Sequence, residues 1–510
     1  MEVQTIMSPG IGFGIIKKYV RGQDLKYEDK KIIIVTDEDL VASDTMNFEW
    51  DKISGIITTS GTKNSHSAIV AKQHEVPAAV ISDITDFIDD DFIAIDTNSS
   101  SKGKVYYKPS IDELKKILTQ LKILNIKKEN LSKYKLPETI TKDGHKVTVA
   151  ANIGCSDDIA EIKKNCAEGI GVVRTEFSYE MFDSLEGRLP TEDELYEEYS
   201  KISNSLTDKP IIVRTLDAGA DKPVSSLIRA GVLKENEINS ALGSRGIRPC
   251  LEHPEILKTQ VKAIMRANYP NNNLHIMFPM ITQVEEIEKG KEIVDDAIKE
   301  LRNQNMNFVE CPIGIMVETP AIAQITDRLS NYCDFISIGT NDLTQYTTAS
   351  DRMNDCVEKI ANPYNPGMVR ILKNIISGAH NGKKRIMCGV CGEIAADPKY
   401  IPLLLAMGLD EFSMNSSSIL PARRLITNLT LEECNNLLDE VLEMDKSSEI
   451  ESYLEVFYKE HNLSIMTKER ESRKENLTDV LKRENSALDL RNEYKELVDE
   501  NLPDYIEEEL

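Results

Sequence analysis

The chain has 510 residues, a length typical of about three domains, and a formal net charge of −24 at pH 7. This negative field argues against a surface for nucleic acid or an anionic membrane, and a hydrophobic content of 41% argues against disorder throughout. The nine cysteines are scattered and odd in number, and no stretch resembles a secretion signal or a membrane span, so we expect a cytoplasmic protein without a disulfide framework.

Residues 1–108 alternate short apolar runs with turn residues, which predicts a small α/β domain. The runs expected to form strands are 31–35, 53–58, 78–80 and 92–95. A helical pattern covers residues 66–74, which places His66 at a helix N-terminus. Free N–H groups and the helix dipole favour an anion there, so His66 could carry a phosphoryl group. A capping or core histidine is the alternative interpretation.

Apolar residues recur at helical spacing between residues 110 and 136, ahead of Pro137. This pattern predicts a linker helix within residues 109–140, and a solvated helix is the simplest interpretation of it.

Residues 141–430 contain eight near-continuous apolar segments separated by helical stretches. These segments are 147–154, 171–175, 211–216, 275–281, 313–318, 335–339, 385–389 and 411–414. Strands of this kind are typical of a parallel sheet covered on both faces, and eight such units predict a (β/α)₈ barrel. An open, doubly wound sheet is the alternative. The fold class is therefore α/β, with a small domain followed by a barrel.

Residues 431–510 are charged and helical in pattern, which predicts a C-terminal extension. Its apolar seam is weak and consists of Leu477, Leu481 and Leu488. A solvated helix is the first interpretation, and a partner-binding helix is the second.

Charged residues gather at the carboxyl ends of the predicted barrel strands, which form the catalytic face of such a barrel. The arginines in these segments are Arg174, Arg214, Arg245, Arg248 and Arg352. Clustered guanidinium groups repel one another unless an anion neutralises them, so the set favours an anionic substrate. Glu318 and Asp342 add two hard oxygen ligands, which suit Mg²⁺ together with substrate phosphate oxygens. An arginine–carboxylate network without metal is the alternative.

Cys391 lies in a C-x-x-C pattern with Cys388 and is flanked by glycines. No second C-x-x-C or paired histidine follows, so a zinc or redox site is weakly supported. Cys391 is either a proton donor or nucleophile, or a buried inert thiol.

Two parts of the chain resemble known families. Residues 58–80 resemble the phosphohistidine swivel domain of phosphoenolpyruvate-utilising enzymes, and the barrel resembles the enzyme I family of the phosphoenolpyruvate:sugar phosphotransferase system. The matching barrel stretches are GIGVVRTEF (169–177), IIVRTLDAGADK (211–222), LGSRGIRP (242–249), IMVETPAIA (315–323), SIGTNDLTQYTTASDR (337–352) and CGVCGEIA (388–395). With MSPGIGFG (7–14), the resemblance spans residues 1–20 and about 30–430.

This resemblance implies a role for each matching residue. His66 matches the phosphorylated histidine, and Cys391 matches the residue that protonates the enolate. Glu318 and Asp342 match the Mg²⁺ ligands. The residues matched to substrate contacts are Arg174, Arg214, Arg245, Asn341, Asp342 and Arg352.

The chain departs from the enzyme I pattern in several places, and two of these departures bear directly on phosphoryl transfer. In the loop before His66, Thr62 replaces a glycine and Asn64 replaces a residue with a hydroxyl group. The sequence therefore does not indicate whether His66 is phosphorylated at a useful rate. Enzyme I also carries a helical domain that binds the phosphocarrier protein, whereas residues 20–30 form only a short link here. The identity of the phosphoacceptor protein therefore stays open too.

The resemblance implies a phosphoenolpyruvate-dependent protein phosphotransferase that uses Mg²⁺, phosphorylates His66, releases pyruvate and passes the phosphoryl group to a partner. The resemblance is also compatible with a homodimer that forms through the barrel domain. Pyruvate phosphate dikinase and phosphoenolpyruvate synthase share both domains, but they need an ATP-grasp domain for which no stretch is long enough. The alternative is a protein that is not primarily an enzyme. It would be a catalytically weak paralogue that senses phosphoenolpyruvate and acts as a regulatory or partner-binding protein.

Overall fold

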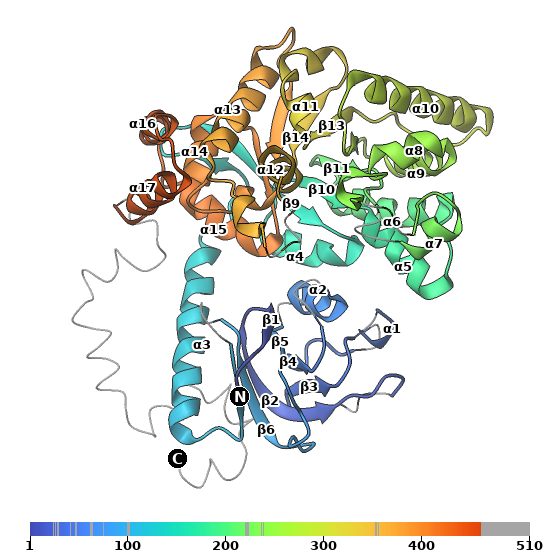
Figure 1. Cartoon of the computed structure of the whole chain (residues 1–510). Coiled ribbons are helices and arrows are strands. Elements are labelled where there is room, and N and C mark those ends of the chain that lie inside the picture. Colours follow the sequence, from blue (N-terminus) through green and yellow to red (C-terminus); the bar gives the residue numbers. More distant parts are fainter. Residues whose placement is uncertain are drawn as a thin grey trace. The chain divides into compact units, whose positions relative to one another are not determined.

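The computed structural model describes most of residues 1–460 as two compact units (Figure 1). The first unit is Met1–Asn130, and the second begins at Leu131. The residues outside the description are 24, 26, 28–29, 41, 46–47, 62–64, 75, 99–102, 220–223, 236, 238, 352–353, 355 and 461–510.

The first unit is built on a seven-stranded sheet with the order β1-β5-β4-β3-β2-β6-β7. Its strands are β1 (Thr5–Ser8), β2 (Ile11–Lys18), β3 (Ile32–Thr36), β4 (Ile53–Thr58), β5 (Ala78–Val80), β6 (Phe92–Asp96) and β7 (Lys104–Tyr107). Its two short helices are α1 (Ala42–Thr45) and α2 (His66–Gln73). The four predicted strands are confirmed as β3 to β6, and the predicted helix is α2.

Strand β2 is indicated in the sequence only by the family resemblance, because glycines interrupt its apolar pattern. A Cβ atom on Gly12 would lie 1.7 Å from the Ser54 carbonyl oxygen, so a side chain cannot fit at this position. The strand pairs in parallel with β3 and antiparallel with β6, which makes it central to the sheet.

Residues 19–31 connect β2 to β3, as the sequence predicts for a short link in place of a domain. The buried Tyr19 hydroxyl donates to Asp44 Oδ1 at 2.9 Å. Leu25 and Tyr27 pack against the apolar core beside β3 and β4. The described part of the link therefore covers the sheet.

Helix α3 (Ile111–Ser132) follows the sheet and contains the predicted linker helix. Leu114, Ile117 and Leu118 are buried and pack against Phe13 and Phe92 of the sheet. The first half of α3 is thus a packed part of the first unit, and the interpretation as a solvated helix is wrong for it.

The second unit is a closed barrel of eight parallel strands, which confirms the predicted fold and excludes an open sheet. Its strands are β9 (Lys146–Ile153), β10 (Ile170–Arg174), β11 (Ile211–Arg214), β12 (Leu274–Phe278), β13 (Ile313–Val317), β14 (Phe335–Ile338), β15 (Met387–Val390) and β16 (Glu411–Met414), with β8 (Thr139–Ile140) antiparallel to β9. Every predicted barrel strand overlaps one of these eight.

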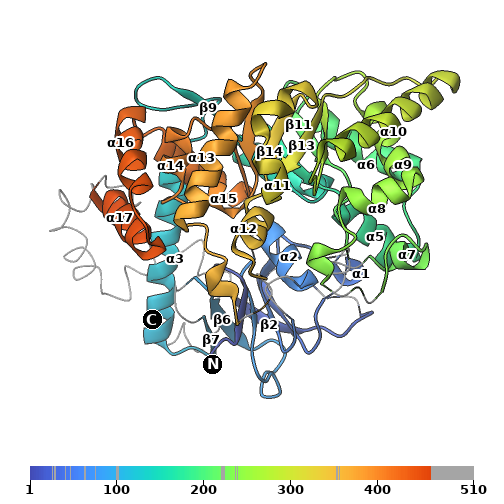
Figure 2. The same ribbon diagram turned by 45° about the horizontal axis from the view of Figure 1, so that its top comes forward.

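Helices cover the outside of the barrel (Figure 2). They are α4 (Ile159–Lys164), α5 (Glu176–Glu186), α6 (Glu192–Ser205), α7 (Ser225–Arg229), α8 (Ile247–Glu252), α9 (Pro254–Ala267), α10 (Val284–Asn303), α11 (Pro320–Ala323), α12 (Thr340–Thr348), α13 (Pro366–Asn381), α14 (Ile401–Ala406) and α15 (Ser416–Ile426). Alternate strand residues, such as Ile336 and Ile338 of β14, join the large core under these helices. The residues that alternate with them along the strands face the barrel interior, and Phe335 is one of those that form a separate inner cluster.

Two further helices, α16 (Leu431–Leu442) and α17 (Ser447–Glu460), continue the second unit. Leu437 and Leu438 of α16 and Ile450 and Leu454 of α17 are buried in the barrel's outer core. This part of the predicted extension is therefore packed rather than solvated. Leu477, Leu481 and Leu488 lie outside the described residues. Within the described part of the chain, no helix is long and apolar enough to cross a membrane.

Candidate active site

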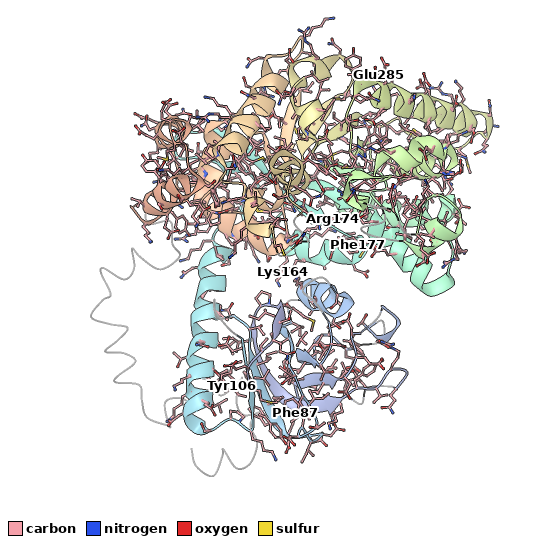
Figure 3. The ribbon with its side chains drawn as sticks, in the orientation of Figure 1. Phe87, Tyr106, Lys164, Arg174, Phe177 and Glu285 are labelled. Carbon is pink, nitrogen blue, oxygen red and sulfur yellow. The ribbon has the colours of Figure 1, made fainter. Side chains whose placement is uncertain are left out.

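Two arginines end neighbouring barrel strands and lie side by side. Arg174 ends β10 and Arg214 ends β11, and the two residues are paired in register. Arg174 is half-buried near Phe177 (Figure 3) and, within the described residues, has no hydrogen bond or ion pair. A half-buried guanidinium group without a protein partner favours an anionic ligand.

Arg214 and Arg245 form a buried ionic network beside this position. Arg214 donates through Nη2 to Glu176 Oε1 at 2.5 Å and through Nη1 to Asp217 Oδ2 at 3.0 Å. Arg245 has a side chain only 1% exposed and contacts Asp217 Oδ2 and Asp342 Oδ1, each at 3.1 Å. Burial lowers the pKa of Arg214, but the carboxylates of Glu176 and Asp217 outweigh it and raise that pKa. Both guanidinium groups are therefore held in fixed positions by carboxylates.

Glu318, which follows β13, is a buried carboxyl group beside this network. Its Oε1 accepts the Met280 backbone N–H at 2.6 Å. Burial and the neighbouring Asp342 and Asp217 raise the pKa of Glu318 to about 8, against the opposing effect of Arg214 and Arg245. At neutral pH this group holds a proton unless a cation takes its place.

These carboxyl groups fit a divalent cation. Four carboxylates (Glu176, Asp217, Glu318 and Asp342) and two guanidinium groups leave a formal charge of −2 when all are ionised. The Glu318 side chain packs directly on Gly339, because a Cβ atom there would lie 2.7 Å from Glu318 Oε2. Among the described residues, no group of three or more His, Cys, Asp or Glu side chains forms a complete metal cage. Mg²⁺ does not require one, since it takes one or two carboxylates together with substrate oxygens and water.

We expect the Glu318→Gln variant to separate the electrostatic cost of this carboxyl group from its role in cation binding. The folded chain raises the pKa of Glu318 to about 8, so stability is lost as pH rises from the ordinary glutamate range to that value. Without metal above pH 8, the variant should melt at a higher temperature, by about 1–2 °C for each kcal/mol of relieved penalty in a unit of this size. Differential scanning calorimetry at pH 6 and pH 9, with and without Mg²⁺, measures this.

The matched control is Glu198→Gln, which removes a buried carboxylate that accepts from Ser156 instead. Added Mg²⁺ should raise the melting temperature of the unaltered chain and of this control, but not that of Glu318→Gln. Equal stabilisation of all three proteins by Mg²⁺ would contradict the assignment of Glu318.

Cys391 follows β15 and lies at the inner face of the barrel. Its side chain packs with Val172, Met316 and Phe335, and it is 7% exposed. Burial raises the pKa of the thiol, although the Ser337 hydroxyl and the cations Arg214 and Arg174 lower it. The net direction is upward, so the thiol is protonated at neutral pH, as a proton donor requires.

Cys388 belongs to the outer core under the helices, whereas Cys391 belongs to the inner cluster. All nine cysteines are free. The C-x-x-C pattern therefore does not form a two-thiol site.

The remaining predicted substrate contacts lie in two segments. Asn341 and Asp342 are in the first turn of α12, directly after β14, and Asn341 Oδ1 accepts the Glu393 backbone N–H at 3.2 Å. Arg352 lies outside the described residues. Arg248 donates to the carbonyl oxygens of Leu242 and Gly243, so it holds its own loop instead of joining the buried network.

Glu176 is a member of the site that sequence reasoning missed. It opens α5, two residues after Arg174, and its Oε1 accepts from Arg214. Its position just after a barrel strand could have identified it, because side chains there lie on the same face as the other site residues.

In the first unit, His66 is the first residue of α2, as predicted. Ser65 precedes it with extended backbone and makes no side-chain cap, while the Ser67 N–H in the first turn donates to Asp39 Oδ1 at 3.3 Å. The His66 side chain and the loop residues Thr62 to Asn64 lie outside the described residues. The fold thus provides a helix N-terminus at the predicted position.

Comparison with known proteins gives two family matches and a set of close relatives. Residues 128–431 match the PEP-binding domain of PEP-utilising enzymes, and residues 28–100 match the mobile domain of the same enzymes. The chain is 38% identical over 434 residues to the phosphoenolpyruvate-protein phosphotransferase of Staphylococcus carnosus, covering 84% of this chain and 73% of that protein. Its counterpart in Bacillus subtilis is 38% identical over 428 residues, with the same two coverages.

Proposed function

The chain belongs to the family of PEP-utilising enzymes, and on this basis we propose that it transfers the phosphoryl group of phosphoenolpyruvate to a protein. The observation that carries the proposal is the arginine set of the barrel. Arg214 and Arg245 are fixed by carboxylates, and Arg174 beside them has no protein partner among the described residues. Phosphoenolpyruvate carries a phosphate and a carboxylate, both of which planar guanidinium groups bind well.

His66 is the first acceptor of the phosphoryl group. Its imidazole attacks phosphorus, so that a P–N bond forms while the P–O bond to the enolate breaks. Catalysis of such a transfer consists of positioning and charge stabilisation, which the fixed arginines supply. The helix N-terminus at His66 then stabilises the phosphorylated side chain.

Cys391 completes the first half-reaction. Its thiol gives a proton to the methylene carbon of the enolate, which forms the methyl group of pyruvate. The raised pKa of the thiol keeps this proton available at neutral pH.

Mg²⁺ is the cofactor that the carboxyl groups would hold, with Glu318 and Asp342 as its protein ligands. When bound there, it would neutralise charge on the transferring oxygens. The formal charge of −2 in the buried network supports this assignment.

A phosphoacceptor protein receives the phosphoryl group from His66. The free state of all nine cysteines supports a reducing compartment, and we place the protein in the cytoplasm. Pairing of two chains through the barrel domain is compatible with this chemistry.

The proposal is tested by mixing the chain with phosphoenolpyruvate and Mg²⁺ in the absence of any acceptor. One equivalent of pyruvate per chain should appear in a burst and then stop, because His66 holds one phosphoryl group. Binding of phosphoenolpyruvate without any pyruvate would contradict the proposal and favour the phosphoenolpyruvate-sensing alternative.

We expect slow phosphoryl transfer from this chain to a standard phosphocarrier protein. A specific interface buries about 800 Å² per partner, and residues 19–31 are too few to fold as a docking domain of that size. Encounter must then use the remaining surface of the first unit, so transfer should need high carrier concentrations. The measurement is transfer of label to a purified carrier, with full-length enzyme I as the control. Equally fast transfer by both proteins would contradict this expectation.

A further inference from the structure

Asn152 lies on the inner face of the barrel, near the carboxyl end of β9. Its neighbours along the strand, Ala151 and Ile153, belong to the outer core under the helices, so the Asn152 side chain faces the interior. Asn152 is paired in register with Val172 of β10, which packs in the inner cluster together with Cys391. It therefore lies close to the residue whose thiol gives the proton in the proposed reaction.

The Asn152 carboxamide is held by three hydrogen bonds. Its Nδ2 donates to the Cys391 carbonyl oxygen at 3.1 Å and to the Ser413 carbonyl oxygen at 3.3 Å. Its Oδ1 accepts the Ser413 hydroxyl at 2.5 Å. Because the amide nitrogen only donates and the amide oxygen only accepts, these bonds permit one orientation of the group. The carboxamide thus joins β9 to β16 and to the residue that follows β15.

Cys391 is held from two sides. Strands β15 and β16 are paired in register at Val390 and Phe412, and Cys391 follows directly after this pair. On the β14 side, its backbone N–H donates to the Ile338 carbonyl oxygen at 3.2 Å, and its thiol lies 3.7 Å from the same oxygen. On the other side, Asn152 binds its carbonyl oxygen. The backbone of Cys391 is therefore fixed at both its N–H and its carbonyl group.

The position of the backbone decides where this thiol can act. One torsion angle, χ1, separates the sulfur atom from the backbone, so a shift of the backbone moves the sulfur with it. The enolate of pyruvate is planar at its methylene carbon, and the proton reaches that carbon from one face. Misplacement of a reacting group by about 1 Å can slow a reaction about 10²-fold. A side chain that fixes the Cys391 carbonyl group therefore bears directly on proton delivery.

We propose that Asn152 is a positioning residue, which holds Cys391 so that its thiol gives the proton to one face of the enolate. This inference rests on the proposed function. The S–H bond breaks, the electron pair of the enolate C=C bond forms the new C–H bond, and the enolate oxygen becomes the keto oxygen of pyruvate. The thiolate takes a proton from water after pyruvate leaves. Without Asn152, part of the enolate leaves before it is protonated, and water then protonates it on either face.

The test uses phosphoenolpyruvate with deuterium at one methylene position and tritium at the other, in a fixed arrangement. Protonation by a positioned thiol gives a chiral methyl group of one configuration, whereas protonation in solution gives both configurations equally. A parallel reaction with radiolabelled phosphate measures labelling of the chain, which precedes protonation. The configuration therefore reports the position of the proton donor, and the label reports phosphoryl transfer.

We expect Asn152→Ala to form pyruvate about 10–10²-fold more slowly than the unaltered chain and with mixed configuration. Labelling of the chain should keep nearly its unaltered rate, because the acceptor and the arginine set are unchanged. Ser413→Ala should give a smaller loss of configuration. It keeps both donors of the Asn152 carboxamide but removes the hydroxyl that orients its oxygen.

The matched control is Asn273→Ala. Asn273 is buried and directly precedes β12, at the opposite end of the barrel strands from the site. Its carboxamide makes the same kinds of bond as that of Asn152. Nδ2 donates to the carbonyl oxygens of Ser203 and Leu206, each at 2.9 Å, and Oδ1 accepts the Ser203 hydroxyl at 2.8 Å. This control should keep the rate and the configuration of the unaltered chain.

A single configuration from Asn152→Ala would overturn the positioning role even if both rates fell, because a general structural defect would slow labelling and protonation together. If that variant does not fold, an unchanged configuration from Ser413→Ala would overturn it. Mixed configuration from Asn273→Ala would do so too, since loss of any buried carboxamide would then suffice. Absence of pyruvate from the unaltered chain would instead overturn the proposed function, and mixed configuration from that chain would overturn Cys391 as the donor. The role of Asn152 would fall with either.

Discussion

Replacement of His66 by alanine is expected to abolish labelling of the chain by radiolabelled phosphoenolpyruvate, while phosphoenolpyruvate still binds. The reason is that the phosphoryl acceptor and the residues that bind phosphoenolpyruvate belong to different units. His66 begins α2 of the first unit, whereas Arg174, Arg214 and Arg245 belong to the barrel. Loss of the imidazole removes the acceptor atom but leaves the buried network around Arg245 intact. Label on the protein and calorimetric binding of phosphoenolpyruvate are the two measurements.

The matched control for this experiment is His74→Ala, at the other end of the same helix. His74 directly follows α2, and its ring stacks on Trp50 with a centroid distance of 4.0 Å, so its loss tests the effect of removing a histidine next to this helix. This control should accept label as the unaltered chain does. Equal labelling of His66→Ala and the unaltered chain would show that another residue carries the phosphoryl group.

Replacement of Cys391 by alanine is expected to slow pyruvate formation by about 10²–10⁴-fold, which is the usual contribution of a positioned proton donor. Affinity for phosphoenolpyruvate should change little, because protonation concerns the leaving enolate rather than the bound substrate. The alanine methyl group still contacts the apolar lining formed by Val172 and Met316. The measurement is the rate of pyruvate formation in a single turnover, alongside the dissociation constant of phosphoenolpyruvate.

Cys388→Ala provides the control for the loss of a buried thiol. Cys388 lies on β15, the strand that precedes Cys391, but it faces the outer core, away from the site. It should form pyruvate at the unaltered rate. If Cys391→Ala also keeps that rate, Cys391 is a packing residue and the enolate receives its proton from another group.

Much of the fold was predictable because the barrel strands are buried on both faces. Such strands consist of near-continuous apolar residues, as in Ile211–Arg214. This pattern is easily distinguished from the spaced apolar residues of the helices around them. The predictions that failed concern which helices are exposed to solvent. Leu114 of α3 and Leu437 of α16 lie in charged stretches that suggest solvated helices, yet both side chains are buried. Which neighbour covers a helix depends on contacts between distant residues, and a single sequence does not show these.

The candidate site was also predictable only in part. The residue types at the strand ends, Arg174 and Glu318 among them, are enough to indicate an anionic substrate and a cation. The pairing of Arg214 with Glu176 depends on strand register. Register is set by packing across the whole barrel, so this ion pair appears only in three dimensions.

Mapping the label left by radiolabelled phosphoenolpyruvate and Mg²⁺ on the unaltered chain tests the central claim most directly. The proposed chemistry predicts label on the peptide that contains His66, stable in base and lost in acid, as a phosphoryl group on an imidazole nitrogen is. Label that survives acid, or that maps to a peptide without His66, would contradict the claim that this histidine takes the phosphoryl group from phosphoenolpyruvate.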